Sequence, residues 1–222
     1  MSDQDRSNTT KKSTVYVALI TALAIIIGSV ILGLGGQTTP QEPVAEAAPA
    51  VELPNAGITE SNKASITFTT NQGEIVIETT PAVAPLTVNA IAALAQKNYF
   101  DNTICHRLTT AGIYVLQCGD PTGTGTGGPG FNIPDENLPQ SSENNYPAGT
   151  VAMANAGPGT SGSQFFLVYQ DTTLGPDYTI WGSVTSGLDI LQTIASAGVV
   201  DGGTDGAPLT GVTIESTKVT IS

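Results

Sequence analysis

The segments that decide the fold are Met153–Ala156 (MANA) and Gly162–Phe166 (GSQFF). Two earlier segments belong with them, Cys105–Arg107 (CHR) and Gln117–Asp120 (QCGD). Together the four segments combine one arginine with two glutamines, an asparagine and several large apolar side chains. They contain almost no acid, base or nucleophile, so the set is better suited to holding and twisting a peptide than to cutting one.

Hydrophobic periodicity around these segments predicts a mainly β fold. Residues 64–79 alternate apolar and polar side chains on either side of a turn at Asn71–Gly73, which predicts a β-hairpin with one apolar face. Apolar residues recur at helical spacing after Pro85 and again at 188–194, which predicts two helices. We expect a strand that carries His106 and Arg107, followed by short strands at 114–117, 150–153, 164–168, 179–184 and 212–221, the last bent near Ser216. Many short strands with two helices indicate a closed antiparallel barrel capped at its ends.

The charge balance of the chain argues against nucleic acid as a partner. The 222 residues carry a formal net charge of −12. Residues 63–222 contain 13 carboxylates and four basic side chains, Lys63, Lys97, Arg107 and Lys218. No basic patch can form from so few cations, and the acidic surplus favours solubility.

An uncharged apolar run at 15–34 predicts a membrane-spanning helix. Its 20 residues reach about 30 Å as a helix, which is the thickness of the hydrocarbon core of a bilayer. Lys11 and Lys12 precede the run and no basic residue follows it before Lys63. The positive-inside rule therefore places the N-terminus in the cytoplasm and everything after residue 36 outside it. The alternative is a signal peptide cleaved near 45–47, which would yield a secreted protein.

These features divide the chain into four parts. We expect a cytoplasmic tail at 1–14, a transmembrane anchor at 15–36, a flexible linker rich in proline, alanine and glutamate at 37–62, and a folded domain at 63–222. Four prolines in the linker interrupt any regular element, which suits an extended tether.

The four quoted segments resemble the cyclophilin family of peptidyl-prolyl cis-trans isomerases, and the resemblance extends from about Ala64 to the C-terminus. It implies an antiparallel eight-stranded barrel, closed and capped by two helices, with no cofactor and no metal. It also implies a monomer that isomerises proline-containing polypeptides. Together with the predicted membrane anchor, this activity would assist the folding of exported proteins. The CHRL and QCGD patterns are similar to those of actinobacterial members.

The resemblance also assigns site residues. Arg107 matches the catalytic arginine, whose planar guanidinium donates to the substrate carbonyl during rotation, and Gln117 matches the glutamine that orients it. A structural salt bridge is the alternative for Arg107. The other residues implied are a proline pocket of Tyr114, Val115, Phe166, Leu174 and Tyr178, and a peptide-binding strip of Ala154, Asn155, Ala156 and Gln164.

Several positions depart from the common family pattern. Tyr114 and Val115 replace a Phe-Met pair, and the connection before them is about two residues longer. Tyr178 replaces a histidine at the pocket rim, so we expect turnover with an altered substrate preference. No tryptophan occurs at 171–174, where the cyclosporin-sensitive members carry one, and Trp181 matches a core aromatic instead. We therefore expect weak cyclosporin binding, with no inhibition at low nanomolar drug.

Cys105 and Cys118 are the only cysteines. In the family's fold they fall on neighbouring antiparallel strands, and an exported location permits a disulfide between them. Two buried thiols acting as small apolar side chains are the alternative.

Other site chemistries lack the partners they need. Gly119–Gly130 is glycine-rich but is not followed by Gly-Lys-Ser/Thr, so a phosphate-binding loop is not expected. Ser161 and Ser163 do not complete a nucleophile elbow, and His106 has no second histidine with which to bind a metal. Within the same fold, the alternative to an enzyme is a proline-peptide-binding module or chaperone with little turnover.

Overall fold

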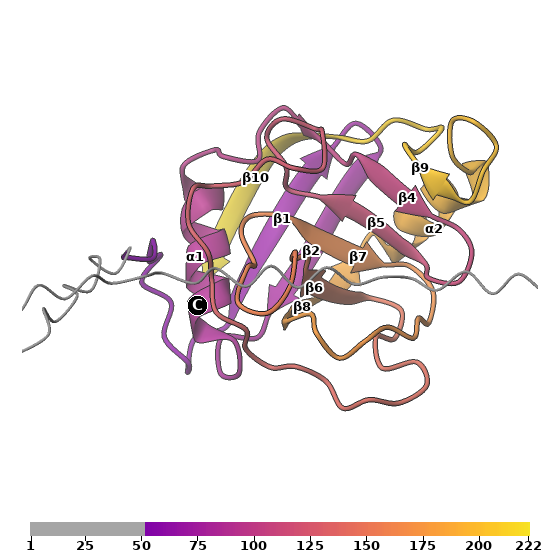
Figure 1. Cartoon of the computed structure of the whole chain (residues 1–222). Coiled ribbons are helices and arrows are strands. Elements are labelled where there is room, and N and C mark those ends of the chain that lie inside the picture. The colour runs from indigo at the N-terminus through magenta and orange to yellow at the C-terminus, as the bar shows by residue number, and fades with distance from the viewer. Residues whose placement is uncertain (1–51) are drawn as a thin grey trace, which may run out of the picture. The chain divides into compact units, whose positions relative to one another are not determined.

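The computed structural model describes residues 52–222. They form one antiparallel sheet of ten strands, curled on itself, and two helices (Figure 1). The strands are β1 (Ala64–Thr70), β2 (Gly73–Thr79), β3 (Thr103–Ile104), β4 (Arg107–Thr109), β5 (Val115–Cys118), β6 (Thr150–Met153), β7 (Phe165–Val168), β8 (Ile180–Ser186), β9 (Asp205–Gly206) and β10 (Thr213–Ile221). The helices are α1 (Pro85–Gln96) and α2 (Leu188–Ala197), which lie at opposite ends of the sheet in Figure 1.

The prediction of a closed eight-stranded barrel is wrong in two respects. The strands follow the order β3-β10-β1-β2-β8-β6-β7-β5-β4-β9, and no pairing joins β3 to β9 within residues 52–222, so the curled sheet stays open. The two strands beyond eight are these end strands, each of two residues. Neither shows apolar alternation, because each forms only where a loop lies against a longer strand, β10 or β4.

The predicted hairpin and helices are confirmed. β1 and β2 pair in register around the turn, and β1 also pairs with β10. Thr69 pairs with Ser216 and Thr70 with Ile214, so Glu215 is the extra residue of a β-bulge at the expected bend. α1 begins at Pro85, where a missing N–H costs no intrahelical bond.

The central strands place side chains alternately on two faces of the sheet. Leu116, Val151 and Phe165 belong to the main core. Trp181 is fully buried there, as expected for a core aromatic, and packs edge-on against Phe165 with ring centroids 5.8 Å apart. Other residues of the same strands face the other side and form a second apolar cluster, Val115, Ala152, Phe166 and Val168, together with Tyr146 from the loop before β6. Because strand side chains have a period of two, the same strands build both the main core and a second, buried apolar cluster on the other face of the sheet.

The residues just before β1 pack onto α1. The Ile58 N–H donates to Asn89 Oδ1 at 2.9 Å, and Asn89 Nδ2 donates back to Ile58 O at 2.7 Å. Ile58 is only 5% exposed, so the domain includes part of the segment that the sequence predicts as a flexible linker. The predicted tail at 1–14 and anchor at 15–36 lie outside the described residues. Within residues 52–222, no helix has the length and apolar character to cross a bilayer.

Candidate active site

Strand register brings four side chains into one row across the outer face of the sheet. Arg107 in β4 lies opposite Gln117 in β5, Gln117 opposite Phe166 in β7, and Phe166 opposite Ala152 in β6. Residues directly opposite each other share a face of the sheet. The pairing alone therefore places the arginine, the glutamine and the aromatic ring side by side.

A cavity of about 180 Å³ opens beside this row. Of the predicted residues it contains the catalytic pair, four of the five pocket residues and part of the peptide-binding strip. Its lining is Arg107, Ile113, Val115, Gln117, Ala154, Asn155, Phe166, Leu174 and Tyr178.

The structure places Tyr114 outside this cavity, which corrects its assignment to the proline pocket. Ile113, Val115 and Gln117 are two residues apart and line the cavity together, whereas Tyr114 lies between them and faces the opposite way. Tyr114 instead packs edge-on against Tyr169, with ring centroids 6.0 Å apart. Ile113 therefore occupies the place assigned to Tyr114, and strand alternation is the signal that could have identified it.

The aromatic wall of the cavity is fixed from behind by a residue that the sequence did not indicate. Phe166 packs edge-on against Tyr178 with ring centroids 5.5 Å apart. The Tyr146 hydroxyl donates to Tyr178 O and accepts from Tyr178 N–H, both at 3.1 Å. Tyr146 is fully buried, and burial raises its pKa to about 12, so it stays a neutral donor at any physiological pH.

Leu174 is held in a similar way by Asn145. The Leu174 N–H donates to Asn145 Oδ1 at 3.0 Å, and Asn145 Nδ2 donates to Leu174 O at 2.9 Å. These two bonds satisfy the Leu174 backbone as a neighbouring strand would, so the rim is set by side chains rather than by the sheet. No periodicity marks such a contact in the sequence.

A larger groove of about 820 Å³ adjoins the cavity and shares Gln117, Ala154 and Asn155 with it. Ala156 and Gln164, both predicted to bind the peptide, line this groove together with the loop 125–132. The Asn155 side chain is engaged within the protein, since its Nδ2 donates to Asp177 O at 2.8 Å. Among the hydrogen bonds of residues 52–222, none involves the backbone N–H or C=O of Asn155, which leaves both available to an extended peptide.

A hydrogen-bonded relay fixes the orientation of Gln117 toward Arg107. Gln164 Nε2 donates to Gly125 O at 3.0 Å and to Gly127 O at 2.9 Å, so its Oε1 must be the acceptor. Gln117 Nε2 donates to that oxygen at 2.8 Å. Gln117 Oε1 is thereby turned toward Arg107 and accepts from Nη1 at 3.3 Å.

The loop at the far end of the relay is organised by Asp120, which is fully buried. Its carboxylate accepts from the Thr122 N–H at 2.7 Å, the Gly125 N–H at 2.6 Å and the Gly127 N–H at 3.1 Å. Burial alone would raise the pKa of Asp120, but these donors and the Thr122 hydroxyl outweigh it and hold the pKa well below its usual value of 3.8. The carboxylate therefore stays charged and sets the carbonyls that Gln164 requires.

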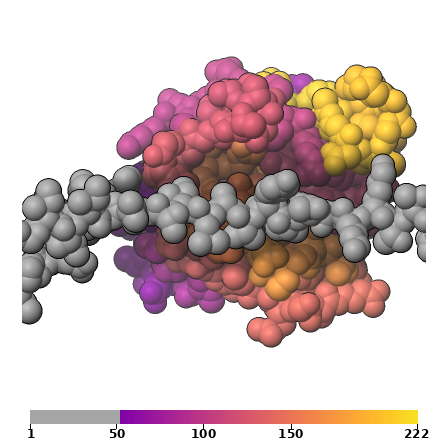
Figure 2. Space-filling view, viewed as in Figure 1, coloured from indigo at the N-terminus to yellow at the C-terminus, as the bar shows by residue number. Residues whose placement is uncertain are grey.

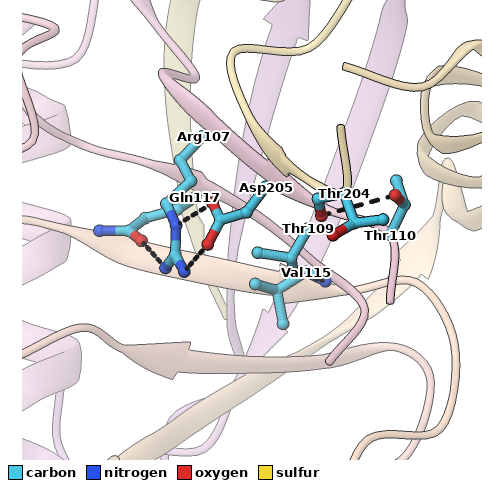
Figure 3. Close-up of polar contacts among 7 residues, drawn as sticks. All are labelled: Arg107, Thr109, Thr110, Val115, Gln117, Thr204 and Asp205. Atoms are coloured by element: carbon cyan, nitrogen blue, oxygen red, sulfur yellow. Dashed lines mark hydrogen bonds and ion pairs between the residues drawn. The ribbon is translucent and has the colours of Figure 1, made fainter. Parts of the chain in front are cut away.

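At the other end, Arg107 forms an ion pair with Asp205 in β9 (Figure 3). Arg107 Nε donates to Asp205 Oδ1 and Nη2 donates to Oδ2, both at 2.7 Å. Hydrogen bonding to Asp205 raises the pKa of Arg107, and hydrogen bonding to Arg107 lowers the pKa of Asp205. The salt bridge considered as the alternative for Arg107 is thus present, yet the guanidinium still lines the cavity. Nothing in the sequence indicates Asp205, because it lies 98 residues away.

The two cysteines form a disulfide in the structure, with their Cα atoms 4.0 Å apart. Cys105 lies two residues before Arg107, and Cys118 directly follows Gln117. The bridge therefore joins the segment just before β4, which carries the arginine, to the end of β5, which carries its orienting glutamine.

Comparison with known proteins places this site in a family. A model described as cyclophilin type peptidyl-prolyl cis-trans isomerase/CLD matches residues 65–219. Proteins named probable peptidyl-prolyl cis-trans isomerase B are 48% identical over 179 residues in Mycobacterium tuberculosis (strain H37Rv) and 44% identical over 201 residues in Mycobacterium leprae (strain TN). These matches cover 75% and 85% of this chain. The chain spans 58% of the length of the first relative and 68% of the second.

Solved structures show the same likeness. A crystal structure of a Cryptosporidium parvum cyclophilin type peptidyl-prolyl cis-trans isomerase matches with a TM-score of 0.62 at 29% identity, covering 71% of this chain and 98% of its own. A second structure of that protein, in the presence of the dipeptide Ala-Pro, matches with a TM-score of 0.61 at 30% identity, covering 70% and 98%. By its sequence, its curled sheet and its outer-face site, the chain belongs to the cyclophilin family.

Proposed function

We propose that this chain is a peptidyl-prolyl cis-trans isomerase in which Arg107 stabilises the twisted state of the bond before proline. The observation that carries the proposal is the position of Arg107 at an apolar cavity of about 180 Å³ lined by Phe166, Leu174 and Tyr178. This cavity suits the pyrrolidine ring of a prolyl residue, with the cation beside the bond that rotates. The family match and the relatives' names support the same activity.

The chemistry needs no covalent intermediate. Rotation about the bond meets a barrier of about 20 kcal/mol, because the nitrogen lone pair is delocalised into the carbonyl. In the twisted state the lone pair is localised on nitrogen and can accept a hydrogen bond. A guanidinium has five N–H donors in a fixed plane, of which Asp205 takes two and Gln117 one, so two remain for the substrate. Each ~1.4 kcal/mol of preferential binding to the twisted state increases the rate about tenfold.

The groove supplies the ground-state binding. The Asn155 backbone N–H and C=O can pair with the peptide main chain, and Gln164 lies beside them in the same groove. Binding along this strip holds both planar isomers alike, so it affects KM, whereas Arg107 distinguishes the twisted state and affects kcat.

We also propose that the domain works outside the cytoplasm, tethered to the membrane by the predicted anchor at 15–36. The disulfide between Cys105 and Cys118 supports an oxidising compartment, because cytosolic thiols are kept reduced. Lys11 and Lys12 before the apolar run support this orientation. The substrates are then exported polypeptides whose folding is limited by slow proline isomerisation. Fractionation with intact-mass measurement tests the location and the retention of the N-terminal segment.

The activity is tested by measuring kcat/KM for isomerisation of a proline tetrapeptide with the parent, Arg107→Ala and Lys97→Ala. Lys97 is an exposed cation at the end of α1 and serves as the charge-matched control. We expect Arg107→Ala to lower kcat/KM about 100-fold or more and Lys97→Ala to leave it unchanged. Equal rates for the parent and Arg107→Ala would refute the assigned role. A parent that binds the peptide without accelerating exchange would instead identify a binding module.

A further inference from the structure

Sheet geometry places Asp205 beside Arg107 on the same face. The two-residue strand β9 pairs with β4, with Asp205 opposite Thr109 and Gly206 opposite Leu108. Thr109 and Arg107 are two residues apart in β4, so they share a face, and Asp205 is the diagonal neighbour of Arg107. A diagonal neighbour is within reach of a long side chain, and Figure 3 shows the carboxylate beside the guanidinium, on the side away from Gln117.

The segment that carries Asp205 is tied down at several points. Thr110 N–H donates to Thr204 O at 2.8 Å, next to the β4–β9 pairing. At the base of the segment, Val200 N–H donates to Ala207 O and Leu209 N–H donates to Gly198 O, both at 2.9 Å. In Figure 2 this yellow segment forms a compact lobe at the surface. The position of the carboxylate is therefore set by backbone hydrogen bonds rather than by its own side chain alone.

The ion pair controls the plane and the rotation of the guanidinium. Two parallel N–H···O bonds fix a planar fork in one orientation, which a single contact with Gln117 at 3.3 Å cannot do. The side chains of Arg107 and Asp205 are 40% and 54% exposed, so the pair is too solvated to be a principal source of fold stability. The ion pair therefore acts mainly on the orientation of the Arg107 guanidinium and contributes little to the stability of the fold.

We propose that Asp205 is a positioning residue, which holds Arg107 in a single orientation so that its two unused N–H groups face the bound Xaa-Pro bond. This inference rests on the proposed isomerase function. The relay through Gln117 and Gln164 holds one edge of the guanidinium, and Asp205 holds the opposite edge. Preorganised donors avoid the cost of orienting themselves during rotation, so the loss of Asp205 lowers kcat while peptide binding is kept.

The test compares isomerisation kinetics of the full chain for the parent, Asp205→Ala, Asp205→Glu and Asp201→Ala. Asp201 is an exposed carboxylate in the same loop and controls for the charge change. We expect Asp205→Ala to lower kcat about tenfold with KM within about twofold, Asp205→Glu to recover part of the loss, and Asp201→Ala to match the parent. Arg107→Lys lacks the planar fork, so in that background Asp205→Ala should lower kcat by less than about twofold further.

A readout without turnover separates this inference from the proposed function. The chain contains two arginines, Arg6 and Arg107, so its arginine Nε–H NMR spectrum holds two signals. The Arg107 signal should be protected from exchange in the parent and lose that protection in Asp205→Ala. A parent with no isomerase activity would overturn the proposed function. An active parent whose kcat is unchanged or increased in Asp205→Ala would overturn the positioning role of Asp205, as would an Arg107 signal that does not change.

Discussion

Gln117 Nε2 donates to Gln164 Oε1 at 2.8 Å, although the two residues are 47 positions apart. The bond has a fixed direction, since the amide of Gln164 is already committed to two loop carbonyls. It therefore determines which end of Gln117 meets Arg107. The hydrogen bond between Arg107 and Gln117 therefore depends on a chain of amides that begins in the glycine-rich loop.

Breaking this relay at Gln164 should slow turnover without removing any apolar contact. Gln164→Ala frees Gln117 to rotate, and a net hydrogen bond is worth about 1 kcal/mol, so we expect kcat/KM to fall about fivefold. Steady-state kinetics with a proline tetrapeptide measures this. Gln192→Ala, on α2, is the matched control and should behave as the parent. A Gln164→Ala variant as fast as the parent would show that Gln117 does not need the relay.

The cavity lining predicts that Ile113 rather than Tyr114 contacts the prolyl ring. Ile113→Ala removes apolar surface from the cavity, which is worth about 1 kcal/mol and should raise KM about fivefold. Tyr114→Ala affects packing against Tyr169 and should lower thermal stability while KM stays near the parent value. Kinetics and thermal unfolding of both variants measure the difference. A raised KM in Tyr114→Ala together with an unchanged KM in Ile113→Ala would contradict the structure.

The disulfide should stabilise the domain measurably. Cys105 and Cys118 are 13 positions apart, and closing a loop of about this size contributes about 3 kcal/mol. The double variant Cys105→Ser/Cys118→Ser should therefore unfold about 10 °C lower. Thermal unfolding of the parent with and without a reducing agent provides the control, because the reduced parent should approach the variant. No change on reduction would contradict a role for the bridge in stability.

Asp120 should make a pH-dependent contribution to stability. Its pKa is lowered in the folded state from the usual 3.8, so its contribution is fully present above that value and is lost as pH falls toward the folded pKa. Asp120→Asn should be less stable than the parent at pH 5, and the difference should shrink by about 1–2 kcal/mol by pH 2.5. Denaturant unfolding across this range measures it, with Asp201→Asn as the control. A difference that stays constant with pH would mean that the Asp120 charge is not involved.

Helices and strands whose own residues show a regular pattern were predictable from the sequence. Pro85 marked the start of α1, apolar alternation marked β1 and β2, and a bend was expected at the bulge beside Ser216. The end strands β3 and β9 were not predictable, because they form through tertiary contacts and show no local pattern.

The candidate site was likewise predictable only in part. Most residues assigned by family resemblance line the cavity or its groove, and Tyr114 does not, because strand alternation turns it toward Tyr169. Asp205 and Tyr146 were missed because each acts through a contact with a residue far away in the chain. Such partners become visible only when the sheet register is known.

The most direct test of the account is the cis–trans exchange rate of an Ala-Pro peptide in the presence of the domain, measured by NMR exchange spectroscopy with the parent, Arg107→Ala and Lys97→Ala. We expect rapid exchange with the parent and Lys97→Ala, and a rate with Arg107→Ala close to that of the free peptide although the peptide still binds. Exchange as fast with Arg107→Ala as with the parent would contradict it.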